Sequence, residues 1–284
     1  MKQFDVIVVG GGAAGLMAAG AAASRGLSVG LFDKNQQLGR KVRITGKGRC
    51  NVTNNCSVEE VVASCPRGGK FLYGALSAFS PQDTMAFFEG QGVPLKTERG
   101  RRVFPVSDNA HQIADALARW AGKAQVIRQA VTEVLTEGGR AVGVKTAQGA
   151  YHAQGVILCC GGASYPGTGS NGDGYKLASQ LGHTIVKPTP SLVPLVERGD
   201  WCSQLMGLSL RNCGVKVTQQ GKKKPVYEDF GELLFTHFGL SGPTILSASA
   251  HLHGAGKVYR PHRLKTRPEP PAAGPTSFAG LGGA

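Results

Sequence analysis

Three glycines and one acid near the N-terminus have a spacing suited to binding a phosphorylated coenzyme. Gly10, Gly12 and Gly15 form a G-x-G-x-x-G pattern, and Asp33 lies 21 residues after Gly12. In a dinucleotide site the first glycine permits a tight turn, the second lets a pyrophosphate approach the backbone, and the third lets a helix pack on a strand. The helix N-terminus then attracts phosphate, while the acid accepts hydrogen bonds from ribose hydroxyls and repels a 2′-phosphate.

The surrounding segments predict the elements that must position these residues. Residues 4–9 form a β-branched run, residues 16–26 an Ala-rich helical stretch, and residues 27–33 a second strand that ends at the acid. This complete strand–helix–strand context favours a dinucleotide site over a Gly-rich turn in an α/β fold without a ligand. The predicted cofactor-binding residues here are Gly10, Gly12, Ala13, Ala14, Gly15, Asp33 and Lys34.

The next segment, residues 39–54, carries five cations and no acid. A plain NAD domain does not need such a loop, whereas a flavin enzyme often continues from its second strand along the pyrophosphate towards the isoalloxazine ring. Cations there offset two phosphates and an anionic reduced flavin. The alternative is a solvated basic loop. The candidates near phosphate or flavin are Arg40, Lys41, Lys47 and Arg49, and Gly48 joins the predicted cofactor-binding set.

Further along the chain, residues 57–60 and 80–83 resemble helix-starting caps, residues 93–105 a hairpin, and residues 110–121 an amphipathic helix whose Trp120 belongs to the core. Residues 125–128 and 155–160 are predicted strands of the parallel sheet, and residues 131–144 a hairpin that turns at Gly138 and Gly139. Because Cys159 and Cys160 fall within an apolar strand, we expect both to be buried and inert.

Five segments together resemble one bacterial family, the NAD(P)/FAD-dependent oxidoreductases described as aminoacetone-oxidase-like or bile-acid-reductase-like flavoproteins. They are VIVVGGGAAGLMAA, GRKVRITGKGRCNVTN, RRVFPVSDNA, VILCCGGASYPGTGSNGDGYKLA and GELLFTHFGLSGP. The resemblance runs from about residue 4 to residue 250, and its GKGRCN-x-TN and FTHFGLSGP strings are fairly specific. One departure is Asp33, where flavoproteins more often have the longer Glu.

The resemblance implies an α/β fold, with a Rossmann-like FAD-binding domain on a parallel sheet and an inserted β-rich domain. It implies FAD as cofactor, NAD(P)H as reductant, and hydride transfer through the flavin to a small organic acceptor or oxygen. It also implies that the backbone of Val131 meets the adenine, and that Gly161 and Gly162 pass beside the cofactor. The residues themselves assign no catalytic acid or base.

A second G-x-G-x-x-G, residues 167–172, starts six residues beyond its strand and lacks an acid about 20 residues later. We therefore expect a loop that caps a helix beside the flavin rather than a nicotinamide site, and we include Asp173 of that helix among the cofactor-binding residues. After Pro188 the alternating pattern predicts antiparallel strands. His237 is either a proton donor or, more commonly for a lone His between aromatics, a packed residue. Lys222–Lys224 is a hairpin tip more often than an RNA contact.

The expected domains are residues 1–190, which bind FAD, residues 191–250, the β-rich insertion on the substrate side, and residues 251–284, an aberrant or disordered basic tail. A one-base shift over residues 262–284 permits codons that encode a strand, a turn and a leucine-rich helix. This suggests a frameshift that removes the closing segment of the FAD domain, with weak FAD retention and poor stability as consequences. The alternative is a genuine disordered tail.

Composition bounds the remaining possibilities. The 284 residues include 42 glycines without a collagen-like period, and seven cysteines without a CxxC pair, so a zinc site or a disulfide framework is not expected. Reduced thiols favour the cytoplasm. The uncharged run Val6–Ala23 is too rich in glycine and alanine to span a membrane.

The net charge of +14 leaves open a nucleic-acid partner. We rank this partner low because much of the positive charge lies in the tail and in the basic segment 39–54. A small-molecule substrate is expected, and the oligomeric state is not readable. The rival interpretations are a non-catalytic remnant of a flavoenzyme and an RNA-modifying flavoprotein.

Overall fold

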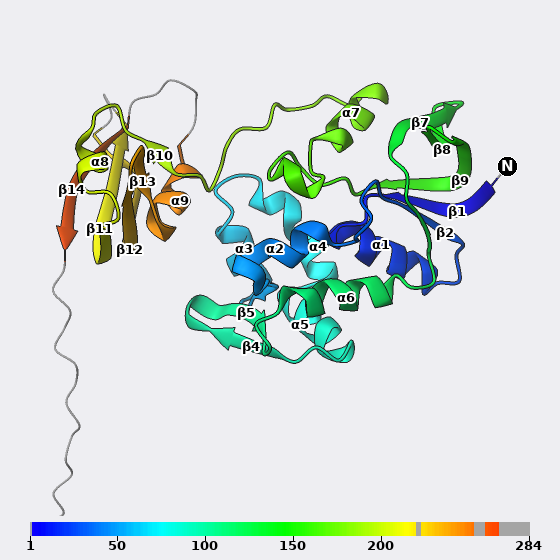
Figure 1. The fold of residues 1–284 in the computed structure, drawn as a ribbon, viewed down its shortest axis with the longest axis horizontal. Helices are drawn as coiled ribbons and strands as arrows, with labels where there is room; N and C mark the ends of the chain where they lie inside the picture. The colour runs from blue at the N-terminus through cyan, green and yellow to red at the C-terminus, as the bar shows by residue number, and fades with distance from the viewer. Residues whose placement is uncertain (1, 220–222, 253–258, 267–284) are drawn as a thin grey trace, which may run out of the picture. The chain divides into compact units, whose positions relative to one another are not determined.

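The structure is a computed structural model that describes residues 2–219, 223–252 and 259–266. The chain divides into two compact units, Met1–Lys187 and Pro188–Ala284 (Figure 1). From the sequence we expected the first domain to extend to residue 190.

A six-stranded sheet, in the order β6-β2-β1-β9-β8-β7, forms the centre of the first unit. Strands β6, β2, β1 and β9 are parallel, and β8 and β7 continue the sheet antiparallel. The predicted α/β class with a mainly parallel sheet is confirmed. The strand bounds are Lys2–Val9 for β1, Val29–Phe32 for β2, Gln125–Ile127 for β6, Val131–Glu137 for β7, Arg140–Thr146 for β8 and Gly149–Leu158 for β9.

The two faces of this sheet have separate cores, since successive side chains of a strand point to opposite faces. Val8 and Leu31 belong to one buried cluster, together with residues of α1 (Ala13–Ala23) and α6 (Ala110–Trp120). Ile7 and Phe32 belong to the other, with Leu177 of α7 (Asp173–Gln180). Burial of both faces explains why residues 6–9 of β1 and the whole of β2 are continuous apolar runs in the sequence.

The contact between α1 and α6 depends on one small residue. Trp120 is half-buried against α1, and its indole Nε1 donates to the Met17 carbonyl at 3.3 Å. A Cβ at Gly20 would lie 2.1 Å from the indole ring. Only a glycine therefore allows the ring to pack there. Ile113 and Leu117 of the predicted core face are buried, whereas Trp120 itself is half-buried.

The shorter elements of the first unit surround this layer, and several match their predictions. Both expected capping boxes are present, at Ser57 and Ser80, and the expected hairpin is β4–β5. The bounds are Arg40–Ile44 for α2, Thr53–Asn54 for β3, Val58–Ala63 for α3, Tyr73–Ala78 for α4, Pro81–Gly90 for α5, Leu95–Glu98 for β4 and Arg102–Pro105 for β5; the 3-10 turns are Thr45–Gly48, Gly69–Leu72, Arg99–Arg101 and Pro166–Thr168.

The second unit contains an antiparallel five-stranded sheet in the order β10-β13-β12-β11-β14. Its buried cluster includes Val215, Leu233 and Phe235 of the long hairpin and Ile245 of α9. The predicted antiparallel texture after Pro188 is therefore present. The bounds are Leu195–Val196 for β10, Trp201–Gln204 for α8, Ser209–Gln219 for β11, Pro225–Thr236 for β12, Gly239–Ser241 for β13, Pro243–Ser249 for α9 and Tyr259–Thr266 for β14.

The expected aberrant tail overlaps one of these elements. Strand β14 runs antiparallel to β11, and it includes the first five residues of the suspected frameshifted stretch, 262–266. The remainder of that stretch, 267–284, and residues 253–258 lie outside the described residues. The frameshift, weak FAD retention and poor stability stay predictions. In the part of the chain that the structure describes, every helix is too short or too polar to cross a membrane.

Candidate dinucleotide site

The turn after β1 has room for no side chain at two of its glycines. Gly10 has a φ of +108°, and a Cβ there would lie 2.4 Å from the Cys159 carbonyl oxygen. A Cβ at Gly15 would lie 1.7 Å from the Gly10 carbonyl oxygen, where α1 crosses the turn. The first glycine thus supplies a left-handed backbone and the third a close helix–strand contact.

The second glycine of the pattern is different, because it faces open space. Gly12 is the N-cap of α1, and apart from its own chain neighbours no described residue has an atom within 4 Å of a Cβ built on it. Among the described residues no side chain caps this terminus. The first amides of α1, at Ala13 and Ala14, therefore remain as hydrogen-bond donors beside the open space, which is the arrangement that attracts a phosphate.

Asp33 directly follows β2 and is held in one orientation by the backbone. Its Oδ2 accepts a hydrogen bond from the Gly11 amide at 2.6 Å, and its Oδ1 accepts from the Asn35 amide at 2.6 Å and from Asn35 Nδ2 at 2.9 Å. A carboxylate offers about four acceptor positions in total. One position remains open, and the single bond from the Gly11 amide joins the acid to the glycine turn.

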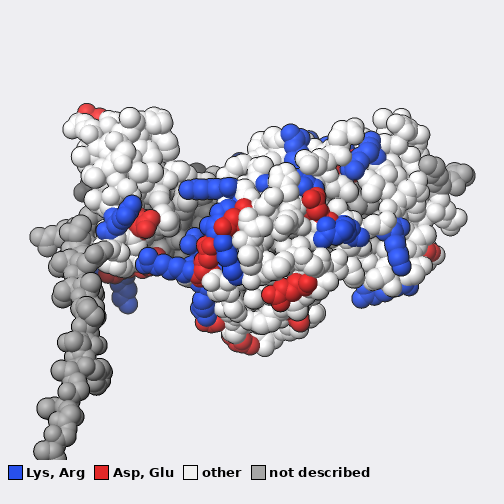
Figure 2. Space-filling view, turned by 60° about the horizontal axis from the view of Figure 1, so that its bottom comes forward, with Lys and Arg blue, Asp and Glu red and all other residues white. Residues whose placement is uncertain are grey.

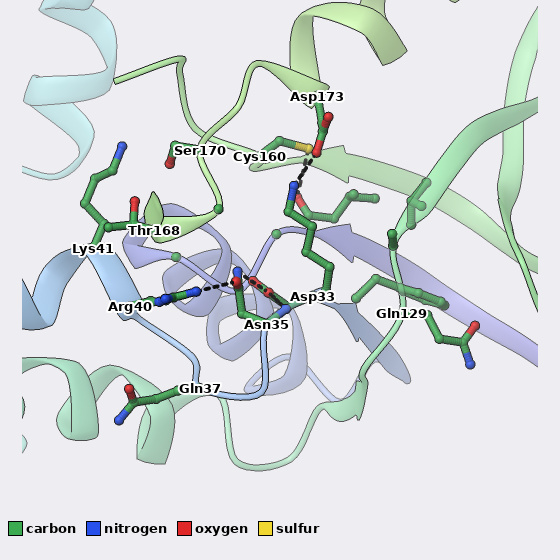
Figure 3. A pocket seen from close by; sticks show the side chains of 18 of the residues that line it. Asp33, Asn35, Gln37, Arg40, Lys41, Gln129, Cys160, Thr168, Ser170 and Asp173 are labelled. Carbon is green, nitrogen blue, oxygen red and sulfur yellow. Dashed lines mark hydrogen bonds and ion pairs between the residues drawn. The ribbon is translucent and has the colours of Figure 1, made fainter. Parts of the chain in front are cut away.

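One cavity collects the turn, the acid and part of the basic segment (Figure 3). Eight predicted residues line it: Gly10, Gly12, Asp33, Lys34, Arg40, Lys41, Val131 and Asp173. Seven predicted residues are not among its lining: Ala13, Ala14, Gly15, Gly48, Arg49, Gly161 and Gly162. The lining residues that sequence reasoning missed are Val9, Phe32, Asn35, Gln37, Gln129, Ala130, Cys160, Thr168, Gly169, Ser170 and Leu177.

Three cations line this cavity and bond to nearby segments of the chain. Lys34 and Lys41 contact the segment that follows β9, and Arg40 contacts Asn35 after β2. Lys34 Nζ lies 2.5 Å from Asp173 Oδ2 and 3.0 Å from Asn171 Oδ1. Lys41 Nζ donates to the Ser164 carbonyl at 2.8 Å, and Arg40 Nη1 donates to Asn35 Oδ1 at 3.3 Å. The charge of Lys34 is paired with a carboxylate, whereas Arg40 and Lys41 bond only to neutral oxygens, so these two cations are available to an anionic ligand.

The remaining cations of segment 39–54 lie elsewhere. Arg43 is nearly buried and joins α2 to α6 through Asp115 at 2.7 Å and His111 Nδ1 at 2.9 Å. Lys47 has a φ of +57° within the turn that also contains Gly48, at +85°. Neither Arg43 nor Lys47 lines the described cavity.

Arg49 is engaged by the hairpin β4–β5 and the loop after it. Its guanidinium lies 2.5 Å from Glu98 and 2.7 Å from Asp108, and 4.2 Å above the Phe104 ring. Lys96 also pairs with Asp108, at 2.7 Å. The Arg49 hydrogen bond lowers the pKa of Glu98, and the Lys96 and Arg49 hydrogen bonds lower the pKa of Asp108. This cluster fixes the loop to the hairpin.

The second glycine pattern forms a loop, as expected, and not a strand-borne turn. Gly172 is the N-cap of α7 and its amide donates to the Gly162 carbonyl at 3.3 Å. A Cβ at Gly169 would lie 2.6 Å from Asn35 Nδ2, so the loop packs directly on the segment after β2. Thr168 and Ser170 face the cavity from this side (Figure 3).

The cysteine prediction needs one correction. Strand β9 ends at Leu158, so Cys159 and Cys160 lie just beyond it and are half-buried rather than within the strand. Burial raises the pKa of Cys160 to about 11, with a further contribution from Asp173, and burial also raises the pKa of Cys159. Both thiols are therefore protonated at neutral pH, which agrees with the inert behaviour expected of them.

His237 lies between β12 and β13 and is exposed, with its ring 4.9 Å from that of Phe238. It is not a buried packed residue, and its role as a proton donor stays a prediction. The Lys222–Lys224 tip falls partly outside the described residues. Among the described residues, no three His, Cys, Asp or Glu side chains gather as metal ligands would.

Comparison with known proteins gives a family match and partial relatives. The model of the HI0933-like protein Rossmann domain matches residues 4–276. The chain is 32% identical over 266 residues to the 3-dehydro-bile acid delta(4,6)-reductase of Clostridium scindens, covering 92% of this chain and 63% of that protein. It is 31% identical over 255 residues to the ribosomal RNA dihydrouridine synthase of Escherichia coli, covering 88% of this chain and 62% of that protein.

Among solved structures, the open conformation of a flavocytochrome c3 fumarate reductase superposes with a TM-score of 0.53 at 21% identity, covering 74% of this chain and 47% of that chain. This similarity supports the fold. The chain spans less than two thirds of the length of the two relatives named above. The family expected from the five motifs is confirmed, and the chain belongs to the HI0933-like protein Rossmann domain family.

Proposed function

We propose that this chain binds FAD and forms the flavin-binding part of an oxidoreductase that moves hydride between NAD(P)H, the flavin and a small organic acceptor. The observation that carries the proposal is one cavity that contains Gly12 at an uncapped helix N-terminus, the oriented carboxylate of Asp33, and the cations Arg40 and Lys41. The helix N-terminus suits a diphosphate and the Asp33 carboxylate suits a ribose, while the two cations can offset the negative charge of the phosphates.

The residues present fit the cofactor. The space in front of Gly12 would take the diphosphate, with the amides of Ala13 and Ala14 as donors. Asp33 would hold the ribose, and Arg40 and Lys41 would exchange their present partners for phosphate oxygens. Val131 and its neighbours, which also line the cavity, would form the wall on the base side. When bound, the flavin ring supplies the hydride chemistry, while the protein binds and orients it.

The reduction of a small organic acceptor is supported by the relative from Clostridium scindens, whose name is that of a bile-acid reductase. NAD(P)H as reductant rests on the resemblance of the motifs, since the second glycine pattern is a loop before α7 and does not directly follow a strand. The acid or base that assists hydride transfer is not assigned to any residue of this chain.

An absorption spectrum tests the proposal. The purified 284-residue protein is equilibrated with FAD, freed of excess ligand by gel filtration and scanned, then mixed anaerobically with NADH or NADPH. We expect flavin bands at a stoichiometry near one, bleached by at least one of the two nucleotides. A protein that emerges colourless from excess FAD would contradict the cofactor assignment, and a flavin that neither nucleotide reduces would contradict the reductant.

A second candidate is an RNA-modifying flavoprotein. It is favoured by the name of the Escherichia coli relative and by the net charge of +14. In the middle of the face drawn in Figure 2, however, Lys and Arg side chains lie among acidic ones. Ion pairs such as Arg101–Glu60 and Arg49–Glu98 also neutralise part of the charge. Binding to ribosomal RNA that weakens steeply between 50 and 200 mM salt would support this candidate. Equal binding at both salt concentrations, or none, would remove it.

A further inference from the structure

We infer that Gln129 is a positioning residue that holds the base-side wall of the dinucleotide cavity in place. The inference rests on the proposed function, because it assigns a part of that same site. It explains a lining residue that neither the glycine motif nor the basic segment predicted.

The order of the strands shows where the base must lie. Phosphate belongs at the glycine turn after β1, and ribose belongs at Asp33 after β2. The next parallel strand in the sheet beyond β2 is β6, which ends at Ile127. The segment that follows, residues 128–131, lies next along the same edge of the sheet, so a base joined to that ribose meets this segment.

This segment has little structure of its own at the point of contact. Ala130 lies between β6 and β7 and belongs to neither strand. Among the described residues its backbone amide and carbonyl make no hydrogen bond. They remain for the edge of a base, but a free backbone of this kind must be held by its neighbours if it is to bind without a large loss of conformational entropy.

Gln129 supplies this restraint through its side-chain amide. Its Oε1 accepts a hydrogen bond from the Thr146 hydroxyl at 2.7 Å, and its Nε2 donates to Gln148 Oε1 at 2.5 Å and to the Tyr151 hydroxyl at 3.2 Å. Thr146 and Tyr151 are 4% and 8% exposed. The amide is thus fixed to two buried side chains of the β8–β9 hairpin, which is itself part of the sheet.

The same network reaches the ribose end of the cavity. The Tyr151 ring packs edge-on against Phe32, with 4.9 Å between ring centroids. Phe32 lines the cavity, immediately precedes Asp33, and its carbonyl accepts the Gly10 amide at 2.7 Å. Tyr151 therefore contacts both Phe32, which precedes Asp33, and Gln129, which precedes Ala130. One buried side chain thus links the ribose end of the cavity to its base side.

Binding of ADP tests the inference in the full chain, with Gln129→Leu as the main variant. ADP contains the base, ribose and diphosphate, whereas inorganic pyrophosphate reports the glycine turn alone. We expect Gln129→Leu to weaken ADP and FAD binding about tenfold and to leave pyrophosphate binding, measured by competition with ADP, within about twofold. Gln129→Glu keeps the acceptor for Thr146 and should recover part of the loss.

Two further variants separate positioning from general stability. Tyr151→Phe retains the ring against Phe32 and removes only the hydroxyl, so we expect a loss of about threefold for ADP with little change in Tm. Gln154→Leu is the matched control, because Gln154 lies on the same hairpin, is exposed and donates to Asp5 Oδ1 at 3.1 Å. It should bind ADP as the parent does.

The outcomes are distinguishable. Equal ADP binding by the parent and by Gln129→Leu and Tyr151→Phe would overturn the inference while the proposed function stands. An equal loss of ADP and pyrophosphate binding would also overturn it, because the damage would not be confined to the base side. A parent chain that binds neither ADP nor FAD would overturn the proposed function, and the inference with it.

Discussion

The two halves of the basic segment 39–54 lie in different surroundings, although they look alike in the sequence. Arg40 and Lys41 line the candidate dinucleotide cavity, and their partners there are an amide oxygen and a backbone carbonyl. Arg49 lies outside the cavity lining and has two carboxylates and an aromatic ring around it. The first half keeps uncompensated positive charge for a ligand, whereas the charge of Arg49 is already neutralised.

This difference depends on residues far away in the sequence. The acids that meet Arg49 are 49 and 59 positions along the chain, in and beyond the β4–β5 hairpin. The segment itself has no acid, so its composition indicates five available cations. A run of charge therefore shows where positive residues are, and the tertiary partners decide which of them a phosphate can use.

The largest expected effect compares two glycines of one motif. Gly12→Val adds a side chain to the space where no described residue beyond its chain neighbours has an atom within 4 Å, so we expect an intact fold and a rise of about 100-fold or more in the Kd for FAD. Gly15→Ala places a Cβ 1.7 Å from the Gly10 carbonyl oxygen, so we expect a Tm lower by about 5 °C or more. Titration calorimetry and thermal unfolding measure the two effects. Unchanged FAD affinity in Gly12→Val would contradict this assignment.

An intermediate effect is expected from the cavity-lining cations. Arg40→Gln and Lys41→Gln each remove one charge beside the predicted diphosphate, and each should weaken FAD binding about fivefold to tenfold at low salt. The difference from the parent should shrink as salt rises from 20 to 300 mM, because screening weakens the same attraction. If both variants bind FAD like the parent at low salt, these cations do not face the phosphates.

A smaller effect is expected from Arg49→Gln, and on a different property. The variant loses two ion pairs and the contact with Phe104, so it should unfold about 2–4 °C earlier. Its Kd for FAD should stay within about twofold of the parent value. A tenfold loss of FAD affinity without a change in Tm would place Arg49 at the cofactor and would contradict the difference between Arg49 and the cavity-lining cations.

The smallest expected effect is a pH dependence of the same cluster. The pKa values of Glu98 and Asp108 are lowered from 4.5 and 3.8 by Arg49 and Lys96. A lowered carboxyl pKa adds stability that is complete above the unfolded-state value and is lost as pH falls through the folded-state value. Thermal unfolding between pH 6 and pH 3 should therefore show a smaller fall in Tm for Arg49→Gln than for the parent. Parallel curves would show that Arg49 does not hold these carboxyls.

Much of the first unit could be predicted because its signals are local. The glycine motif, the apolar runs of β1 and β2, the capping boxes at Ser57 and Ser80, and the turn at Gly138 and Gly139 each act within a few residues. The family strings extend this to the order of the elements. The capping boxes, for example, begin α3 and α5 at the expected positions.

The parts that could not be predicted depend on tertiary contacts. Gln129 has no motif, and its position at the cavity follows from β6 pairing with β2 and from Thr146 and Tyr151 on another hairpin. Asn35 joins the site because it bonds Asp33 and packs against Gly169, 134 residues away. Cys159 and Cys160 were placed within a strand because apolar composition continues past the last paired residue, Leu158.

A crystal structure of the chain with FAD is the most direct test of the dinucleotide site. We expect the diphosphate in front of Gly12, within hydrogen-bond distance of the amides of Ala13 and Ala14, and a ribose hydroxyl on Asp33. We also expect the adenine against residues 129–131. FAD bound at another place on the chain, or a diphosphate that does not contact the start of α1, would contradict it.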